Sequence, residues 1–192
     1  MYTAKEYTPL LGTPGFSDTL LTTHFGLYEG YVKNTNAAVA TLQALREAGN
    51  FGAEYAEIKR RFGWEFGGMR LHELYFDNLT PHAEEFSAET PLAQALVAQF
   101  GSVAAWQKDF VSTGSLRGIG WALLVQDLQT GDVYNIWVNE HDVGHLVGTT
   151  PLLIMDVFEH AFVLDYGMKR AEYISAFMHA VHWEVVNNRF VS

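Results

Sequence analysis

The sequence predicts an α+β protein with two parts. Residues 1–85 are expected to form a helical N-terminal domain, and residues 86–192 an α/β C-terminal domain. Three observations support this division: a length of 192 residues suits one or two domains, apolar residues recur at helical spacing in the first eighty or so positions, and β-rich runs flanking a turn appear only later.

The first long helix is predicted from about Asp18 to Ala48, with Ser17 as its cap and Gly49 after its end. His24 lies within its apolar stripe, which also contains Leu20, Leu27, Tyr28, Tyr31, Ala38, Val39, Leu42 and Leu45. A short helical stretch over 54–62 is expected to end before the glycine pair 67–68. A second long helix then runs from Met69 to about Asn78, so this part forms a helical hairpin.

The C-terminal part begins with two helices, one opened by Pro91 after Thr90 and one that Ser102 caps and that runs through Phe110. Two β-rich runs over 121–125 and 133–138 flank a turn at 129–132 and predict a hairpin. A third apolar run over 152–155 leads to Asp156. Helices are expected from Phe158 and from Tyr173 to Asn188.

Composition limits the function. The chain has no cysteine, so disulfides, thiolate ligands and cysteine nucleophiles are excluded. A formal net charge of −10 argues against nucleic acid or an anionic membrane as partners. Because the first 25 residues lack a basic start followed by an apolar run, and no long apolar run follows, we expect a cytoplasmic protein without a membrane span.

Four residues on apolar elements suggest a metal site. Asp156 and His160 are four positions apart, so in a helix they would share one face. His24 and His72 lie on the apolar sides of two other predicted helices. Each histidine alone could be a hydrogen-bonded core residue, but burying all four groups without partners would cost about 1–3 kcal/mol each. One shared ion satisfies them together, and imidazoles with a carboxylate suit iron, manganese or zinc, the first two best.

The other histidines carry less information. His82 is expected in a loop, and His179 and His182 are expected to be structural residues of the last helix. His141 and His145 follow the second strand, either near a metal or as polar loop residues.

With these residues in view, the chain resembles the iron/manganese superoxide dismutase family. The segment Asp156-Val157-Phe158-Glu159-His160-Ala161 is similar to the family's Asp-Val-Trp-Glu-His-Ala signature, with Phe158 in place of Trp. Similar pieces occur in the family's order along nearly the whole chain: His24 with 30–32 and Asn36, His72 before 75–76, then 100–102, 120–122 and 183–190. The implied fold is a helical N-terminal hairpin plus an α/β lobe with a three-stranded antiparallel sheet.

The resemblance implies roles for single residues. The metal ligands of one iron or manganese ion per chain would be His24, His72, Asp156 and His160. Tyr31 would be the gateway tyrosine and Arg170 the arginine of the substrate funnel, where a local positive rim attracts an anion to a negative protein. Glu159 would bond a ligand histidine across the interface of a homodimer or tetramer.

The chain also departs from the family pattern. His24 and Tyr31 are seven positions apart, one fewer than is usual, which predicts a first helix without a π-bulge. Tyr28 stands where the family usually has a histidine, Val163 where its tyrosine partner from the other subunit is expected, and Leu123 where a second tryptophan is expected. These replacements predict that the cross-dimer pair is lost.

The residue that hydrogen-bonds the solvent on the metal is usually a glutamine. At one of its two positions this chain has Gly68, which is typical of the manganese pattern. At the other position it has His141, to which we assign the hydrogen bond to the solvent. A histidine there is mildly typical of the iron pattern, so on balance we favour iron.

The expected activity is the disproportionation of superoxide to O2 and H2O2, with His141 and Tyr31 tuning the metal's potential through hydrogen bonds. Two alternatives remain. A non-haem iron oxygen-activating enzyme would use two histidines and Asp156 as a facial triad, although a fourth protein ligand argues against it. A non-catalytic relative of the family would be expected to have lost ligands, and all four are present.

Overall fold

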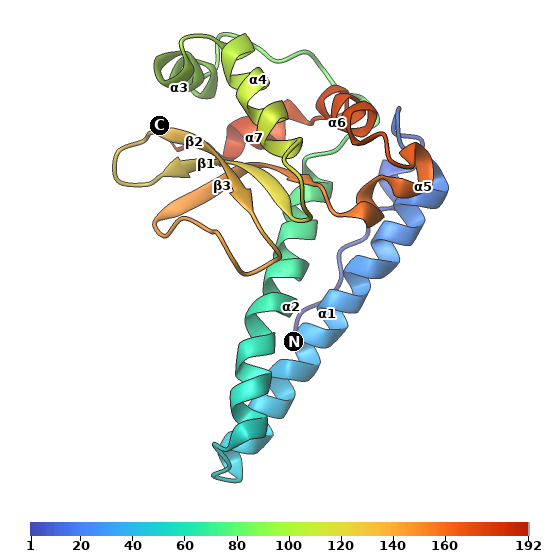
Figure 1. Cartoon of the computed structure of the whole chain (residues 1–192), viewed down its shortest axis with the longest axis vertical. Coiled ribbons are helices and arrows are strands. Elements are labelled where there is room, and N and C mark those ends of the chain that lie inside the picture. Colours follow the sequence, from blue (N-terminus) through green and yellow to red (C-terminus); the bar gives the residue numbers. More distant parts are fainter. Residues whose placement is uncertain (192) are drawn as a thin grey trace.

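The computed structural model describes residues 1–191 and confirms the α+β class. Two long antiparallel helices form a hairpin that projects from a broader C-terminal part (Figure 1). The helices are α1 (Asp18–Glu47), α2 (Ala53–Asp77), α3 (Pro91–Phe100), α4 (Val103–Gly114), α5 (Val163–Tyr166), α6 (Arg170–His179) and α7 (Trp183–Arg189), with single 3₁₀ turns η1 (Thr8–Leu10) and η2 (Glu159–Ala161).

Helix α1 forms as its sequence predicts. The Ser17 hydroxyl accepts a hydrogen bond from the Leu20 amide at 3.0 Å, which satisfies one of the unpaired N–H groups of the first turn. The helix is α-helical throughout Asp18–Glu47, so the short spacing between His24 and Tyr31 is accommodated without a π-bulge. His24, Tyr28 and Tyr31 are all buried on the side facing the rest of the protein.

Helix α2 differs from the prediction of two separate helices, because it continues through Gly67 and Gly68. Both glycines lie where another chain segment approaches closely. A Cβ atom on Gly67 would lie 2.3 Å from the His141 carbonyl oxygen, and one on Gly68 would lie 2.7 Å from the Tyr31 ring. The pair therefore makes room for neighbours and does not end the helix.

The sheet has the predicted three antiparallel strands, β1 (Trp121–Asp127), β2 (Val133–Val138) and β3 (Thr149–Asp156), in the order β2-β1-β3. Central strand β1 is buried from Trp121 to Gln126. Its first residue pairs with Asp156. Asp156 is the last residue of β3, a strand that packs against α2 of the hairpin (Figure 1).

The C-terminal helices are shorter than predicted. The helix expected over 173–188 is interrupted after His179. There the Thr80 amide donates to the Ala180 carbonyl at 3.0 Å, and the His182 amide donates to the Asn78 carbonyl at 2.6 Å. These bonds to the segment after α2 replace the bonds that would continue the helix. The helix expected from Phe158 is likewise only the turn η2 followed by α5.

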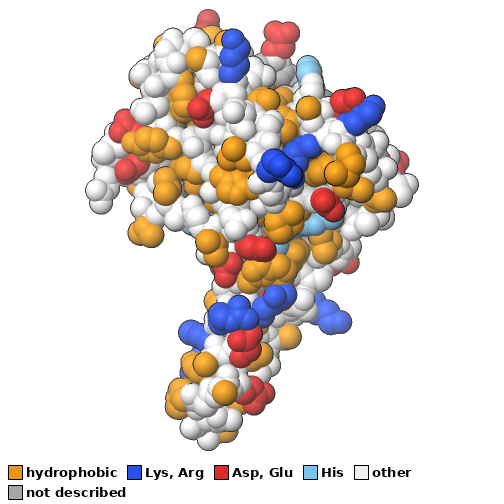
Figure 2. All heavy atoms as spheres, viewed as in Figure 1, with side chains coloured by type: hydrophobic (Ala, Val, Ile, Leu, Met, Phe, Trp, Pro, Cys, Tyr) orange, Lys and Arg blue, Asp and Glu red, His pale blue; other side chains and the backbone are white. Residues whose placement is uncertain are grey.

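One hydrophobic core includes residues of both halves of the chain, among them Leu20, Phe76, Trp121 and Phe177. The proposed division at residue 85 lies in the segment between α2 and α3 and stays a prediction. Within residues 1–191, the helices are all too short or too polar to cross a membrane. The projecting hairpin carries interspersed acidic and basic side chains (Figure 2).

Candidate metal centre

Four side chains from four elements converge between the hairpin and the sheet. They are His24 of α1, His72 of α2, Asp156 at the end of β3 and His160 of η2, and one nitrogen or oxygen atom from each lies within 4.8 Å of the others. The Nε2 atoms of His24, His72 and His160 lie 3.3, 3.6 and 3.1 Å from Asp156 Oδ2. The structure thus brings together the four residues that the sequence suggested as ligands.

These separations suit a shared ion. Nitrogen and oxygen ligands bind a transition metal at about 2.0–2.2 Å, so neighbouring ligand atoms lie about 3.0–3.6 Å apart at angles of about 90–120°. His24 Nε2 and His72 Nε2 are buried and make no hydrogen bond within residues 1–191. Buried polar atoms rarely lack a partner. The donor set of three imidazoles and a carboxylate fits iron or manganese.

The protonation states also suit a metal. Burial lowers the pKa of His24 and of His72, which keeps both rings neutral. Burial alone would raise the pKa of the Asp156 carboxyl, but the adjacent His160 and His24 imidazoles hold this pKa far below its usual range. Neutral imidazole and ionised carboxylate are the forms that bind metals.

Backbone contacts orient the ligand atoms. His72 Nδ1 lies 2.6 Å from the Gly68 carbonyl oxygen. Because a carbonyl can only accept, Nδ1 carries the proton and the lone pair is on Nε2, which faces Asp156. The Phe158 amide donates to Asp156 Oδ1 at 2.8 Å, which leaves Oδ2 as the atom that faces the histidines.

Asp156 and His160 do not share a helical face, contrary to the sequence-based hypothesis. Asp156 ends a strand, and His160 belongs to the 3₁₀ turn η2. The chain turns between them so that His160 Nε2 still lies 3.1 Å from Asp156 Oδ2. The His160 side chain is 27% exposed, whereas those of His24, His72 and Asp156 are almost fully buried. His160 therefore lies on the side of the site nearest the surface.

A hydrogen-bonded chain lies beside the four residues. The Tyr31 hydroxyl is 2.8 Å from His141 Nε2, and the Trp121 indole N–H donates to His141 Nδ1 at 3.1 Å. Burial lowers the pKa of His141 to about 4, so the ring is neutral. Since Nδ1 accepts from Trp121, the single ring proton is on Nε2 and is donated to the Tyr31 oxygen.

Tyr31 faces the site through its ring as well. The ring stacks on His72 with centroids 5.0 Å apart. Burial raises the pKa of Tyr31, which keeps the phenol protonated. Its oxygen accepts from His141, so its own hydrogen is free to point elsewhere. His141 uses Nε2 to bond Tyr31 and Nδ1 to bond Trp121. The role that the sequence assigned to His141, a hydrogen bond to solvent on the metal, stays a prediction.

Arg170 lies at the start of α6. Its guanidinium donates to the carbonyl oxygens of Leu116, Gly118 and Val157 at 2.7, 2.6 and 3.0 Å. It thereby ties the loop after α4 to the residue that follows Asp156. Together with Glu159, it lines a surface cavity. Its role in a substrate funnel stays a prediction.

Tyr28 has a structural environment that the sequence did not reveal. It is fully buried, donates to Glu73 Oε1 at 3.1 Å and accepts from the Lys5 amide at 3.0 Å. Glu73 also pairs with Arg70 at 2.5 Å. The hydroxyl therefore links α1, α2 and the N-terminal segment beside His72, one of the four candidate ligands.

Two residues beside His141 also escaped sequence reasoning. Trp64 and Glu140 are joined by a hydrogen bond of 3.2 Å. Trp64 lies about two helical turns before His72 and thus on the same face of α2. That signal is visible only if the helix continues through the glycine pair.

Comparison with known proteins identifies relatives. The family model described as iron/manganese superoxide dismutases, C-terminal domain, matches residues 88–189. The chain is 38% identical over 180 residues to superoxide dismutase (Mn) 2 of Haloferax volcanii, covering 93% of this chain and 88% of the relative. It is 36% identical to superoxide dismutase (Fe) of Cupriavidus metallidurans, with 93% and 90% covered, and 34% identical to superoxide dismutase (Fe) of Aquifex pyrophilus, with 97% and 89% covered.

Proposed function

This chain belongs to the iron/manganese superoxide dismutase family, and we propose that His24, His72, Asp156 and His160 hold the iron or manganese ion at which it disproportionates superoxide to O2 and H2O2. The observation that carries the ligand assignment is the convergence of four ligand atoms within 4.8 Å, two of them buried imidazole nitrogens without a hydrogen bond in the described chain.

When bound by these four residues, iron or manganese would supply one-electron redox chemistry, which is what the conversion of two superoxide ions to O2 and H2O2 requires. The surrounding residues hold the ligands in place and exclude bulk water. Buried rings line the site: Tyr75 and Phe76 pack on His24 with centroids 5.3 and 4.9 Å away, and Trp121 packs on His72 at 5.0 Å. A dry site strengthens every charge interaction within it.

Tyr31 and His141 are proposed to manage the protons that H2O2 requires. His141 donates Nε2–H to the Tyr31 oxygen, which turns the Tyr31 hydrogen away from His141. Burial keeps both groups neutral, so Tyr31 offers a hydrogen-bond donor to an anion in the site without a competing charge. Superoxide is the substrate, and Arg170 is proposed to attract it at the surface.

The choice of metal and the assembly are finer proposals. Relatives named for iron and for manganese are similar to this chain to nearly the same degree, and His141 leads us to favour iron. Glu159 is exposed beside ligand His160, and we propose that it lies at the interface of a homodimer or tetramer, which light scattering on the purified protein measures. We also propose that the protein acts in the cytoplasm.

The decisive experiment compares metal content and dismutase activity in the same preparations. Wild type is expected to contain about one iron or manganese per chain, with activity proportional to that metal. His160→Ala is expected to lose both, whereas His179→Ala, which changes an exposed histidine on α6, retains both. A His160→Ala protein with full metal and activity would overturn the ligand assignment. Metal without dismutase activity, together with O2 consumption on an organic co-substrate, would favour the oxygen-activating alternative.

A further inference from the structure

Glu140 has an unusual backbone conformation. Its φ of +64° makes it the one non-glycine residue with positive φ in the part of the chain that the structure describes. The side chain of glutamate disfavours this left-handed region, so surrounding contacts must maintain the conformation. Glu140 directly precedes His141, and its backbone therefore sets the direction in which the His141 side chain leaves the loop.

The carboxylate of Glu140 has a specific partner. Trp64 of α2 donates its indole N–H to Glu140 Oε2 at 3.2 Å. The other contacts of Trp64 hold the indole in place: the Arg61 guanidinium lies 3.8 Å from the ring centroid, and Arg61 is itself paired with Glu65 at 2.8 Å. The strained loop is thus tied to the middle of a long helix.

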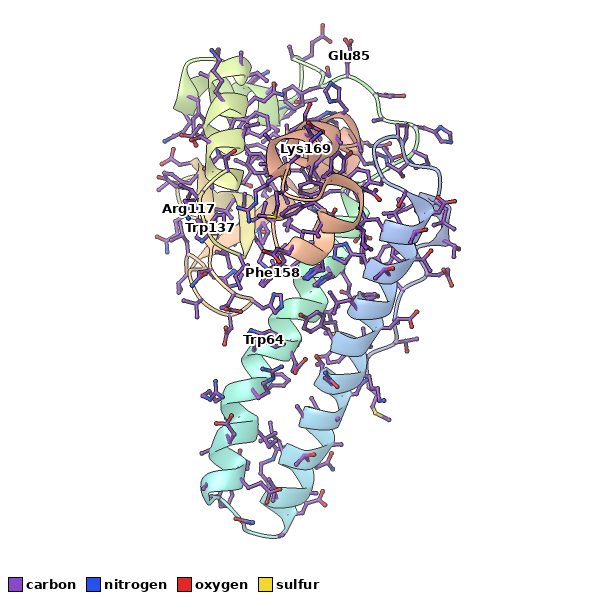
Figure 3. All side chains as sticks on the ribbon, turned by 45° about the vertical axis from the view of Figure 1, so that its right-hand side comes forward. Trp64, Glu85, Arg117, Trp137, Phe158 and Lys169 are labelled. Carbon is purple, nitrogen blue, oxygen red and sulfur yellow. The ribbon has the colours of Figure 1, made fainter. Side chains whose placement is uncertain are left out.

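The same indole packs on both partners of the proton-handling pair. Its ring centroid lies 4.5 Å from that of His141 and 5.4 Å from that of Tyr31. Phe158 packs on His141 at 4.9 Å, and in Figure 3 it lies on the loop above Trp64, where the hairpin meets the C-terminal part. Trp64 and Phe158 are thus among the aromatic rings that pack on His141, and the Glu140 hydrogen bond fixes the orientation of Trp64.

We infer that Glu140 and Trp64 are positioning residues that hold His141 in hydrogen-bond contact with Tyr31. The hydrogen bond keeps the loop in its left-handed conformation, and the indole prevents the His141 ring from turning away. The catalytic consequence rests on the proposed function, but the positioning itself does not. If the pair only stabilised the fold, its loss would lower stability without changing the state of the His141 ring.

The test uses the full chain labelled with ¹⁵N-histidine and loaded with Zn²⁺, a diamagnetic ion that the same donor types bind. Imidazole ¹⁵N shifts report which ring nitrogen of His141 is protonated and whether it is hydrogen-bonded. Trp64→Phe removes the donor and Glu140→Ala the acceptor, whereas Glu140→Gln retains an acceptor oxygen. Trp106→Phe is the matched control, since it removes an indole hydrogen bond of 3.0 Å to Asn135 on the far side of the sheet.

Trp64→Phe and Glu140→Ala are expected to shift or broaden the His141 ring signals, while Glu140→Gln and Trp106→Phe leave them as in wild type. With the redox-active metal, the first two variants are expected to show a kcat about tenfold lower at unchanged metal content and KM. Unchanged His141 signals in both Trp64→Phe and Glu140→Ala would overturn the inference. Because the NMR comparison needs no dismutase activity, its result is separate from that of the proposed function.

Discussion

Replacement of Gly67 by alanine tests whether the close approach of α2 to His141 matters. A Cβ atom at this position would lie 2.3 Å from the His141 carbonyl oxygen, 3.0 Å from its carbonyl carbon and 3.3 Å from its Cβ. Ordinary contacts begin near 3.4 Å, so the loop must move by about 1 Å relative to a helix that is fixed on both sides. A movement of about 1 Å is large enough to break the hydrogen bond from His141 to Tyr31, whose atoms are 2.8 Å apart.

The expected free-energy change has two opposing parts. Alanine in a helix interior is favoured over glycine by about 1 kcal/mol, and overpacking costs about 1–3 kcal/mol. The net effect is a loss of up to about 2 kcal/mol, and a loss of about 2 kcal/mol lowers Tm by about 4–8 °C for a chain of this size. The activity per metal is expected to fall about tenfold, because His141 no longer holds Tyr31.

Gly63→Ala is the matched control, one turn earlier on the same helix. Its Cβ would meet only Asp142 side-chain atoms at 3.8 and 3.9 Å, so helix propensity alone acts and stability is expected to rise by about 1 kcal/mol. The two variants are compared by thermal denaturation and by activity per bound metal. If Gly67→Ala were as stable and active as Gly63→Ala, the steric argument for the glycine pair would be wrong.

Two further changes test the surroundings of the site. Tyr28→Phe removes a buried hydroxyl that hydrogen-bonds Glu73 and the Lys5 amide. We expect the free energy of unfolding, measured with denaturant, to fall by about 1–3 kcal/mol. Tyr134→Phe, at an exposed position, is the control, and equal stability of the two variants would show that the Tyr28 hydrogen bonds do not stabilise the fold. Removal of the metal by a chelator is expected to lower Tm, and addition of iron or manganese is expected to restore it, because the ion binds only the folded site. An unchanged Tm would count against a metal ion that is shared by four elements.

The elements with strong local signals were predictable from sequence. Ser17 starts α1 because its hydroxyl can accept from a free backbone N–H, and the two β-rich runs flanking 129–132 pair as a hairpin. These features depend on neighbouring residues, so the order of residues along the chain contains the relevant information. The family motif around Asp156 and His160 similarly identifies the candidate ligands by residue type and order.

Other features depended on contacts between distant segments. Gly67 and Gly68 are in general helix-weakening residues, but here they lie within α2 because His141 and Tyr31 occupy the space that side chains would need. The helix over 173–188 is interrupted because the backbone near Ala180 and His182 bonds the segment after α2. Propensity alone predicted the opposite in both cases, since tertiary contacts outweigh it.

The four candidate ligands were thus recognisable in the sequence, whereas their surroundings required the folded chain. Sequence order places His24, His72, Asp156 and His160 on separate elements, and their chemistry favours a shared ion. Only the packing of α1 and α2 against the sheet shows that Trp121 and Tyr31 use both nitrogens of His141, or that Trp64 and Glu140 meet beside it. A hydrogen bond between residues 76 or 110 positions apart leaves no local pattern, because its geometry exists only after the segments have packed together.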